Sequence, residues 1–132
     1  VTLAKGISLL DLCPKIQTLD GTFKFMGIYS KNREEWIITD LASHLNSVTV
    51  VALIDSLGDE NISFILMETK ITSIVMESIN LKKINSLKQT NKTCNLRNII
   101  LLDEEQKDEI TKAKQLGFKI YFYSFNFVFM HF

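Results

Sequence analysis

The sequence predicts an α/β fold built on a doubly wound, mostly parallel sheet. Apolar, often β-branched segments of strand length alternate five times with segments whose apolar residues recur at helical spacing. The connections between them are short and carry no Asn-Gly type hairpin signal. The composition, 46% hydrophobic and 23% charged, is globular, and 132 residues suit one domain or a piece of a larger one.

The first 22 residues are expected to lead into the sheet. Residues 1–13 hold apolar side chains at roughly helical spacing, and Pro14 stops any helix there because its ring fixes φ and it lacks an N–H. Those side chains are Leu3, Ile7, Leu10 and Leu12. Residues 17–22 are interpreted as a polar connector with a turn at Asp20-Gly21. The chain begins with valine, which favours a fragment or a processed product.

Residues 23–29 predict a buried strand, in which Gly27 indicates close backbone approach by a neighbour. Asn32 is predicted to cap the following helix, because Glu35 stands three residues later at the capping-box spacing. The helix is expected to end near residues 46–47. Its predicted apolar face consists of Ile38, Leu41, Ala42 and Leu45.

Residues 48–54 are nearly continuously apolar, which predicts a strand covered on both faces. A loop at residues 55–58 follows, and Ser56 or Asp59 is expected to cap the next helix. In that helix one face is predicted to be apolar, formed by Ile62, Ile65 and Leu66.

The second half repeats the alternation. Strands are predicted at residues 71–76, 96–102 and 118–123, and a helix at 78–88. Asp103 and Gln106 have the capping-box spacing for a further helix, and Gly117 stands where a helix C-terminal glycine belongs. The residues expected to face inward are Leu81, Ile84, Leu87, Ile110 and Ala113.

Residues 121–132, YFYSFNFVFMHF, hold seven of the thirteen aromatic residues of the chain. One interpretation is an exposed, adhesive edge strand through which the chain self-associates or aggregates. The other, which we favour, is translated sequence that does not belong to the fold.

Charge and cysteine content exclude several function classes. Fifteen basic and fifteen acidic residues cancel, so no global field directs the chain to nucleic acid. Cys13 and Cys94 cannot form a disulfide framework and are expected to be reduced thiols. No signal peptide or apolar run of transmembrane length is legible, so the protein is not expected to be secreted.

No catalytic motif is present. The chain lacks a Gly-x-Gly-x-x-Gly fingerprint, a P-loop and a Gly-x-Ser-x-Gly elbow. His44 and His131 are far apart in sequence, and His44 is interpreted as a structural helical histidine.

The charged set Lys31, Arg33, Glu34 and Glu35 follows a predicted strand, where α/β folds bind ligands. We favour helix capping and a solvated first turn over a binding site. Trp36 is interpreted as a packing anchor.

The stretch 27–58 resembles long-chain acyl-CoA synthetases, members of the adenylate-forming, AMP-binding enzyme superfamily. The matching residues are Gly27-Ile28, Asn32-Arg33, Glu35-Trp36, Ala42, Ser47, Val51, Leu53, Asp55 and Leu57-Gly58, continued by Glu60, Ile62, Phe64 and Ile65. The resemblance covers about residues 20–120. Ile54 and Ser56 replace the tyrosine and threonine usual in the family.

The resemblance implies an enzyme that activates a fatty acid with ATP and Mg²⁺ to an acyl-adenylate, from which CoA displaces AMP to give the thioester. Residues 1–132 would be a fragment of its N-terminal domain, because the phosphate-gripping loop, the adenine-binding motifs, the ribose-holding acid and the catalytic lysine have no matching positions. We therefore assign no catalytic, cofactor-binding or metal-binding residue, and expect the chain alone to be inactive and to bind none of these cofactors tightly.

For the full enzyme, the resemblance implies fatty acid, ATP and CoA as partners and a place on the cytosolic side of a membrane, at the endoplasmic reticulum, peroxisome or mitochondrial surface. The alternative function is a non-catalytic α/β binding or interaction module derived from the same scaffold. A weaker alternative is a receiver-like domain that uses Asp55 as a phosphoacceptor.

Overall fold

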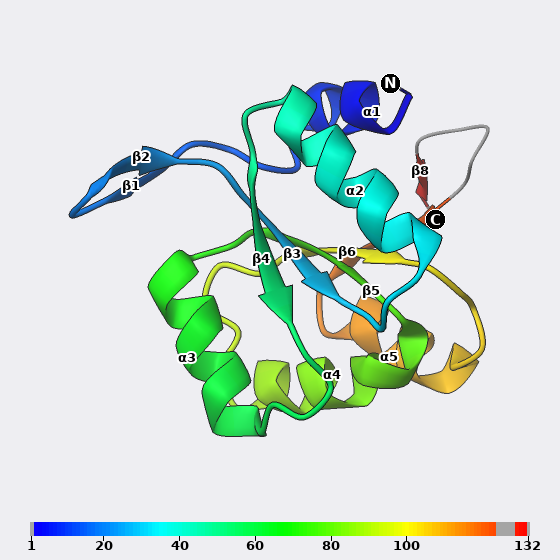
Figure 1. Cartoon of the computed structure of the whole chain (residues 1–132). Helices are drawn as coiled ribbons and strands as arrows, with labels where there is room; N and C mark the ends of the chain where they lie inside the picture. Colours follow the sequence, from blue (N-terminus) through cyan, green and yellow to red (C-terminus); the bar gives the residue numbers. More distant parts are fainter. Residues whose placement is uncertain (1, 124–128, 132) are drawn as a thin grey trace.

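The computed structural model describes residues 2–123 and 129–131. Strands and helices alternate along the chain (Figure 1). The elements are α1 (Thr2–Leu9), β1 (Ile16–Thr18), β2 (Gly21–Phe23), β3 (Phe25–Tyr29), α2 (Glu34–Leu45), β4 (Thr49–Leu53), α3 (Asp59–Thr69), β5 (Ser73–Met76), the 3₁₀ helix η1 (Ser78–Asn80), α4 (Leu81–Gln89), β6 (Asn98–Leu101), α5 (Lys107–Gln115), β7 (Lys119–Tyr123) and β8 (Phe129–His131).

The main sheet has the strand order β4-β3-β5-β6-β7-β8. The first five of these strands are mutually parallel, and β8 pairs antiparallel with β7, with Tyr121 opposite His131. Parallel neighbours joined through helices are what the alternating sequence pattern demands. The predicted α/β fold with a mostly parallel, doubly wound sheet is confirmed.

Helices cover both faces of the sheet. In Figure 1, α1 and α2 lie above it, whereas α3, α4 and α5 lie below. Side chains alternate between the two faces along each strand. In β5, Ile74 and Met76 belong to the core between the sheet and α3–α5, and Val75 belongs to the core between the sheet and α1 and α2. Because both faces are covered, the central strands are buried along their whole length.

The core below the sheet is formed by large aliphatic side chains. Most of the predicted inward-facing residues are buried there, and Ile65 is partly buried against them; the buried ones are Ile62, Leu66, Leu81, Ile84, Leu87, Ile110 and Ala113. Burying one such Leu or Ile side chain contributes about 1.5–3 kcal/mol. The apolar periodicity therefore predicted these three helices correctly.

The core above the sheet combines a few apolar residues with a polar anchor. The Thr72 hydroxyl donates to the Leu12 carbonyl oxygen at 3.0 Å, and the Ser73 hydroxyl donates to the same oxygen. Asn98 Nδ2 in turn donates to Ser73 Oγ at 3.0 Å. These bonds hold the segment after α1 against the sheet and satisfy groups that would be costly to bury unpaired.

Of the two glycine predictions, one is confirmed. At Gly27 the close neighbours are side chains and not the predicted backbone, because a Cβ there would stand 2.7 Å from Ile71 Cδ1 and 3.0 Å from Ile74 Cγ1. Gly117 has φ of +98° directly after the C-cap residue of α5, a conformation that glycine adopts without strain.

The predicted helix caps are wrong. Arg33 and not Asn32 is the N-cap of α2, Gly58 caps α3 in place of Ser56 or Asp59, and Gln106 precedes α5. None of these helix starts has a side-chain cap bond. The physical reason is competition: Glu35 accepts from the Arg33 guanidinium, and the carboxylate of Asp103 accepts from Ser78.

The first connector and the β4 strand also differ from prediction. Instead of a plain turn, residues 16–23 form the β1–β2 hairpin, in which Thr18 pairs with Gly21 across a two-residue loop. β4 is an edge strand whose Val50 and Val51 are only partly buried, so it is not covered on both faces. Its β-branched composition is shared by edge and central strands, which the pattern cannot separate.

The apolar face predicted for α2 is only half correct. Ala42 is buried and Ile38 packs against the upper core, but Leu41 and Leu45 point away from the sheet and are exposed. Thr39 and Ser43, which are polar, lie on the buried side.

The two interpretations of residues 121–132 are only partly open to comparison, because residues 124–128 and 132 lie outside the described residues. β8 pairs with β7 through its backbone.

Candidate functional site

The strand order places a topological switch point between β3 and β5. The helix after β3, α2, lies on the upper face, and the helix after β5, α4, lies on the lower face. The loops that leave these two neighbouring strands therefore diverge, and the crevice outside their carboxyl ends is where open α/β sheets bind ligands. Here the loops that leave the two strands are residues 30–33 and 77–80.

Arg33 spans the switch point. Its Nε and Nη2 donate to the two Glu35 carboxylate oxygens at 2.7 and 2.8 Å, and its Nη1 donates to Glu77 Oε1 at 3.2 Å. Glu77 directly follows β5, so the ion pair joins the β3–α2 loop to the β5–η1 loop. The hydrogen bond from Arg33 holds the pKa of Glu35 below its ordinary value, and the two carboxylates raise the pKa of Arg33.

A second polar link continues along the same edge of the sheet. Ser78 donates to the Asp103 carboxylate through its hydroxyl and, at 3.1 Å, through its backbone N–H. The Gln106 N–H donates to Ser78 Oγ at 3.2 Å. Asp103 lies in the β6–α5 loop. Side chains therefore link the loops that follow β3, β5 and β6, three neighbouring strands of the sheet.

The charged set predicted from the sequence is thus divided by the structure. Arg33 and Glu35 belong to the linked cluster, whereas Lys31 and Glu34 are exposed and outside it. Sequence reasoning missed Glu77 and Ser78, and interpreted Asp103 only as a helix cap. The sequence held a signal for all three residues, since each stands within two residues of the end of a predicted strand.

The other candidate residues do not join this cluster. Trp36 is half-buried, and the mostly exposed His44 has its Nδ1 2.8 Å from the Asp40 carbonyl oxygen. Asp55 is exposed beyond the edge strand β4, and its carboxylate lies 3.5 Å from Asn80 Nδ2. His131 lies in β8, and its side chain is outside the described residues.

Tyr29 and Cys13 have raised pKa values for a common reason, burial of an acid whose ionised form needs solvent. Burial, followed by the charges of Asp55 and Asp59, raises the pKa of Tyr29, whose hydroxyl is buried without a hydrogen-bond partner. Burial raises the pKa of the Cys13 thiol to about 12. Cys13 and the exposed Cys94 are both free thiols. Neither acid is poised for proton transfer near neutral pH.

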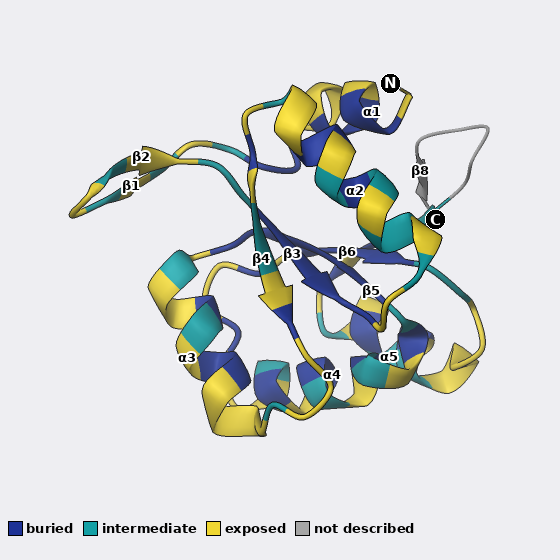
Figure 2. Cartoon of the chain, in the orientation of Figure 1, coloured by how far each residue is buried: buried dark blue, intermediate teal, exposed yellow. Residues whose placement is uncertain are grey.

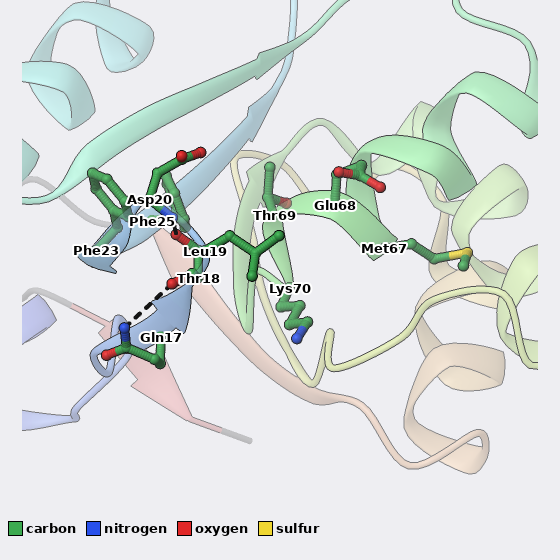
Figure 3. Close-up of a pocket in the computed structure, with 10 residues that line it drawn as sticks. All are labelled: Gln17, Thr18, Leu19, Asp20, Phe23, Phe25, Met67, Glu68, Thr69 and Lys70. Atoms are coloured by element: carbon green, nitrogen blue, oxygen red, sulfur yellow. Dashed lines mark hydrogen bonds between the residues drawn. The ribbon is translucent and has the colours of Figure 1, made fainter.

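The opposite edge of the sheet carries a groove of about 490 Å³ between the β1–β2 hairpin and the C-terminal end of α3. Figure 3 shows Leu19 extending from the hairpin toward Thr69 and Lys70. The rings of Phe23 and Phe25 stack with centroids 5.7 Å apart. Its charged side chains form no linked pair among the described residues, so the groove has the character of a packing surface.

A nucleotide or metal does not fit the switch-point residues. Arg33, the cation best placed for a phosphate, is already paired with two carboxylates, and acidic side chains outnumber basic ones along this edge. Across residues 2–123 and 129–131, no three His, Cys, Asp or Glu side chains gather in a way that could hold a metal ion. No helix in the same residues is long and apolar enough to cross a membrane.

Sequence comparisons identify relatives. No family model matches the chain. Fatty acyl-CoA synthetase B of Dictyostelium discoideum is 31% identical over 121 residues, which are 92% of this chain and 16% of that protein. Long chain acyl-CoA synthetase 8 of Arabidopsis thaliana is 34% identical over 83 residues, 63% of this chain and 11% of the relative. The chain therefore spans about a sixth or less of the length of these relatives.

Solved structures share the fold. The A domain of carboxylic acid reductase from Segniliparus rugosus, determined in complex with AMP and a co-purified carboxylic acid, superimposes with a TM-score of 0.69 at 15% identity. The superposition covers 90% of this chain and 19% of that one. At this identity the likeness establishes the fold alone, and the sequence relatives show that the chain resembles long-chain acyl-CoA synthetases.

Proposed function

Since the chain belongs to the long-chain acyl-CoA synthetases, a family of adenylate-forming enzymes, we propose that it is an N-terminal scaffold portion of a long-chain fatty-acid–CoA ligase. The proposed whole enzyme converts a fatty acid and ATP to an acyl-adenylate and pyrophosphate, and then transfers the acyl group to CoA. A carboxylate is a poor electrophile, and adenylation gives it a good leaving group.

The observation that carries this proposal is the 31% identity with fatty acyl-CoA synthetase B, because it extends over 92% of the chain. A similarity confined to one motif would support only a shared local structure. The strand order and the adenylate-forming fold agree with it.

In this proposal the residues described above act as scaffold. The ATP, Mg²⁺ and CoA sites are assigned to the parts of the enzyme that residues 1–132 do not span. Arg33, Glu35 and Glu77 fix the spacing of two loops at the switch point and take no part in a chemical step.

Partners and location follow from the same proposal. Fatty acid, ATP and CoA are partners of the whole enzyme, which is placed at the cytosolic side of a membrane. Residues 121–132 are proposed as the contact through which the chain alone self-associates.

A chimera tests the proposal. The aligned 121 residues of fatty acyl-CoA synthetase B are replaced by the corresponding residues of this chain, and palmitoyl-CoA formation is measured. We expect measurable turnover, because a related scaffold should position the reacting groups. The control chimera carries Leu66→Asp, which places a charge in the lower core, and is expected to lose activity together with its fold.

A chimera that is soluble and cooperatively folded but inactive would contradict the proposal. In that case the rival, a non-catalytic module on the same scaffold, would be the better description of this chain.

A further inference from the structure

Charge is divided between the two ends of the parallel strands, although the whole chain is neutral. We call the amino edge the connectors that lead into these strands together with the first residue of each strand. These segments are residues 10–25, 46–49, 70–73, 90–98 and 116–119. The amino edge holds six basic and two acidic residues, namely Lys15, Lys24, Lys70, Lys92, Arg97 and Lys119 against Asp11 and Asp20.

The carboxyl edge has the opposite sign. The connectors that leave the strands hold five acidic and two basic residues, namely Asp55, Glu77, Asp103, Glu104 and Glu105 against Lys31 and Arg33. Charges of these signs are common at the two ends of α-helices, where they compensate the helix dipole. Both sets leave out the residues inside α-helices, so the division extends beyond that effect.

Four of the amino-edge cations form a row. Lys24, Lys70 and Arg97 lie in the connectors into β3, β5 and β6, and Lys119 is the first residue of β7. These four strands are consecutive neighbours in the sheet. The Lys119 N–H donates to the Arg97 carbonyl oxygen at 2.8 Å, so those two residues are directly adjacent. Neighbouring strands are about 4.8 Å apart, which places the row within roughly 15 Å.

The cations of the amino edge are accessible to a partner. All of them are exposed except Lys24, which is half-buried. In the ion pairs found among residues 2–123 and 129–131, the basic partners are Arg33 and His44, neither of which belongs to this edge. Like charges held side by side repel one another, and an anionic partner relieves that repulsion. The row therefore suits a negatively charged surface.

An apolar hairpin projects beside the row. In Figure 2 the residues of β1 and β2 are exposed or intermediate, in contrast to the buried β3. Leu19, in the two-residue loop, is 106% exposed, and Met67 across the groove of Figure 3 is 58% exposed. Lys24 directly follows the hairpin, so apolar and basic side chains meet there. Because Asp20 and Glu68 also line the groove, attraction to anions is assigned to the row.

We propose that the amino edge is a peripheral membrane-binding surface, with its cations over anionic lipid headgroups and Leu19 inserted between them. Interfacial binding grows with buried apolar area and with attraction to anionic lipids, and this edge offers both. A nucleic acid would pair with the cations but leave Leu19 in water, so the hairpin favours a bilayer. The proposal rests on the proposed function for its setting, because that function includes a place at a membrane.

Flotation with lipid vesicles tests the contribution of charge. The 132-residue chain is mixed with phosphatidylcholine vesicles that contain either about 30% phosphatidylserine, an anionic lipid, or none. We expect binding to the anionic vesicles to be at least about 10-fold tighter than binding to the neutral ones. Arg97→Gln/Lys119→Gln should weaken anionic binding at least about 10-fold, because each basic residue near a membrane surface contributes about fivefold.

The matched control removes the same charge elsewhere. Lys31→Gln/Lys82→Gln changes two exposed residues outside the amino edge and should alter vesicle binding by less than about 2-fold. Circular dichroism and the midpoint of thermal unfolding confirm that each variant is folded. Equal losses in the two double variants would mean that net charge and not this edge decides binding, which would overturn the proposal.

A second pair of variants tests the contribution of the hairpin. Leu19→Gln leaves the charge unchanged and should weaken binding at least about 5-fold, because a leucine side chain no longer enters the bilayer. Ile79→Gln makes the same kind of change at a residue that is 65% exposed at the carboxyl edge, and should have no effect. An oligonucleotide that binds more tightly than the vesicles, and equally to wild type and Leu19→Gln, would overturn the proposal in favour of nucleic acid.

The same variants are compared in the chimera with fatty acyl-CoA synthetase B, so aggregation of the isolated chain does not remove the test. An active chimera whose flotation none of the variants changes would refute the membrane surface alone. A chimera that floats through the amino edge but makes no palmitoyl-CoA would refute the proposed function and leave the surface standing.

Discussion

The two faces of the sheet are built differently. Below it, α3, α4 and α5 pack Leu and Ile side chains against the strands and close a continuous core. Above it, α1 and α2 bury fewer apolar residues, α2 contributes small ones, and its large side chains face outward. The lower core is therefore closed within the described residues, whereas the upper layer leaves large apolar side chains exposed.

The difference shows that one sheet can carry a closed apolar core on one face and a sparser apolar layer on the other. Local stability comes from the lower core and from the linked loops at the carboxyl edge. The exposed side chains of Ile37, Leu41 and Leu45 on α2 bury little apolar area, so we expect them to add little to that stability. Substitutions in the two halves should accordingly have very different effects on the isolated chain.

The largest effect is expected in the lower core. Leu66→Ala removes a fully buried side chain and should lower the free energy of unfolding by about 2–5 kcal/mol. Urea denaturation followed by circular dichroism measures it. A loss below about 1 kcal/mol would show that the lower core is as loosely packed as the upper face and would break the comparison.

A smaller loss is expected where the sheet and the lower core meet. In Gly27→Ala, the new methyl group would lie 2.7 Å from Ile71 Cδ1, so buried neighbours must shift. Overpacking of this kind costs about 1–3 kcal/mol. Chemical denaturation of the variant tests this, and unchanged stability would mean that Ile71 can move freely.

The carboxyl-edge cluster should have a pH-dependent effect of on the order of 1 kcal/mol, since its side chains are partly exposed. The pKa of Glu35 is lowered in the folded state, so its contribution to stability is present above the ordinary glutamate pKa of about 4.3 and is lost as pH falls through the lowered value. Arg33→Gln should therefore reduce stability at pH 7 and flatten its decline below about pH 4.3.

The measurement is urea denaturation of the wild type and of Arg33→Gln at a series of pH values from neutral to acidic. Lys31→Gln, which removes an exposed cation two residues away, is the matched control and should leave the pH profile as in the wild type. Identical effects of the two substitutions would argue that Arg33 acts only through net charge.

The smallest effect on stability is expected on the outward side of α2, where Leu41 is exposed. Leu41→Ala in the isolated chain should change the free energy of unfolding by no more than about 0.5 kcal/mol, although it truncates the same residue type as Leu66→Ala. Because both variants replace Leu by Ala, the difference between them measures the effect of burial alone. A loss comparable to that of Leu66→Ala would mean that the upper face is already covered in the isolated chain.

Periodicity predicted what depends on repeated apolar contacts. The five parallel strands and the inward faces of α3, α4 and α5 were all predictable, because each position is decided by burial. The caps were not, because Glu35 is bound by the nearby Arg33 and Asp103 is bound by Ser78, which is 25 residues away in the sequence. Only half of the apolar face of α2 was predicted, since Leu41 and Leu45 are exposed while the polar Thr39 and Ser43 are buried.

The carboxyl-edge site was predicted only in part for a similar reason. Arg33 and Glu35 are neighbours in sequence, but Glu77 is 44 residues from Arg33 and comes close to it only because β5 pairs with β3. The family resemblance of residues 27–58 was legible because scaffold positions form long patterns. Those residues identify the enzyme family, and we propose that they serve as its scaffold.

The central claim is that this chain supplies architecture and not the reaction. ATP–pyrophosphate exchange by the purified 132-residue chain, with palmitate and Mg²⁺ present, tests it most directly. The account predicts no palmitate-dependent exchange above the background of a protein-free sample. Exchange that requires palmitate and scales with the concentration of the chain would contradict it.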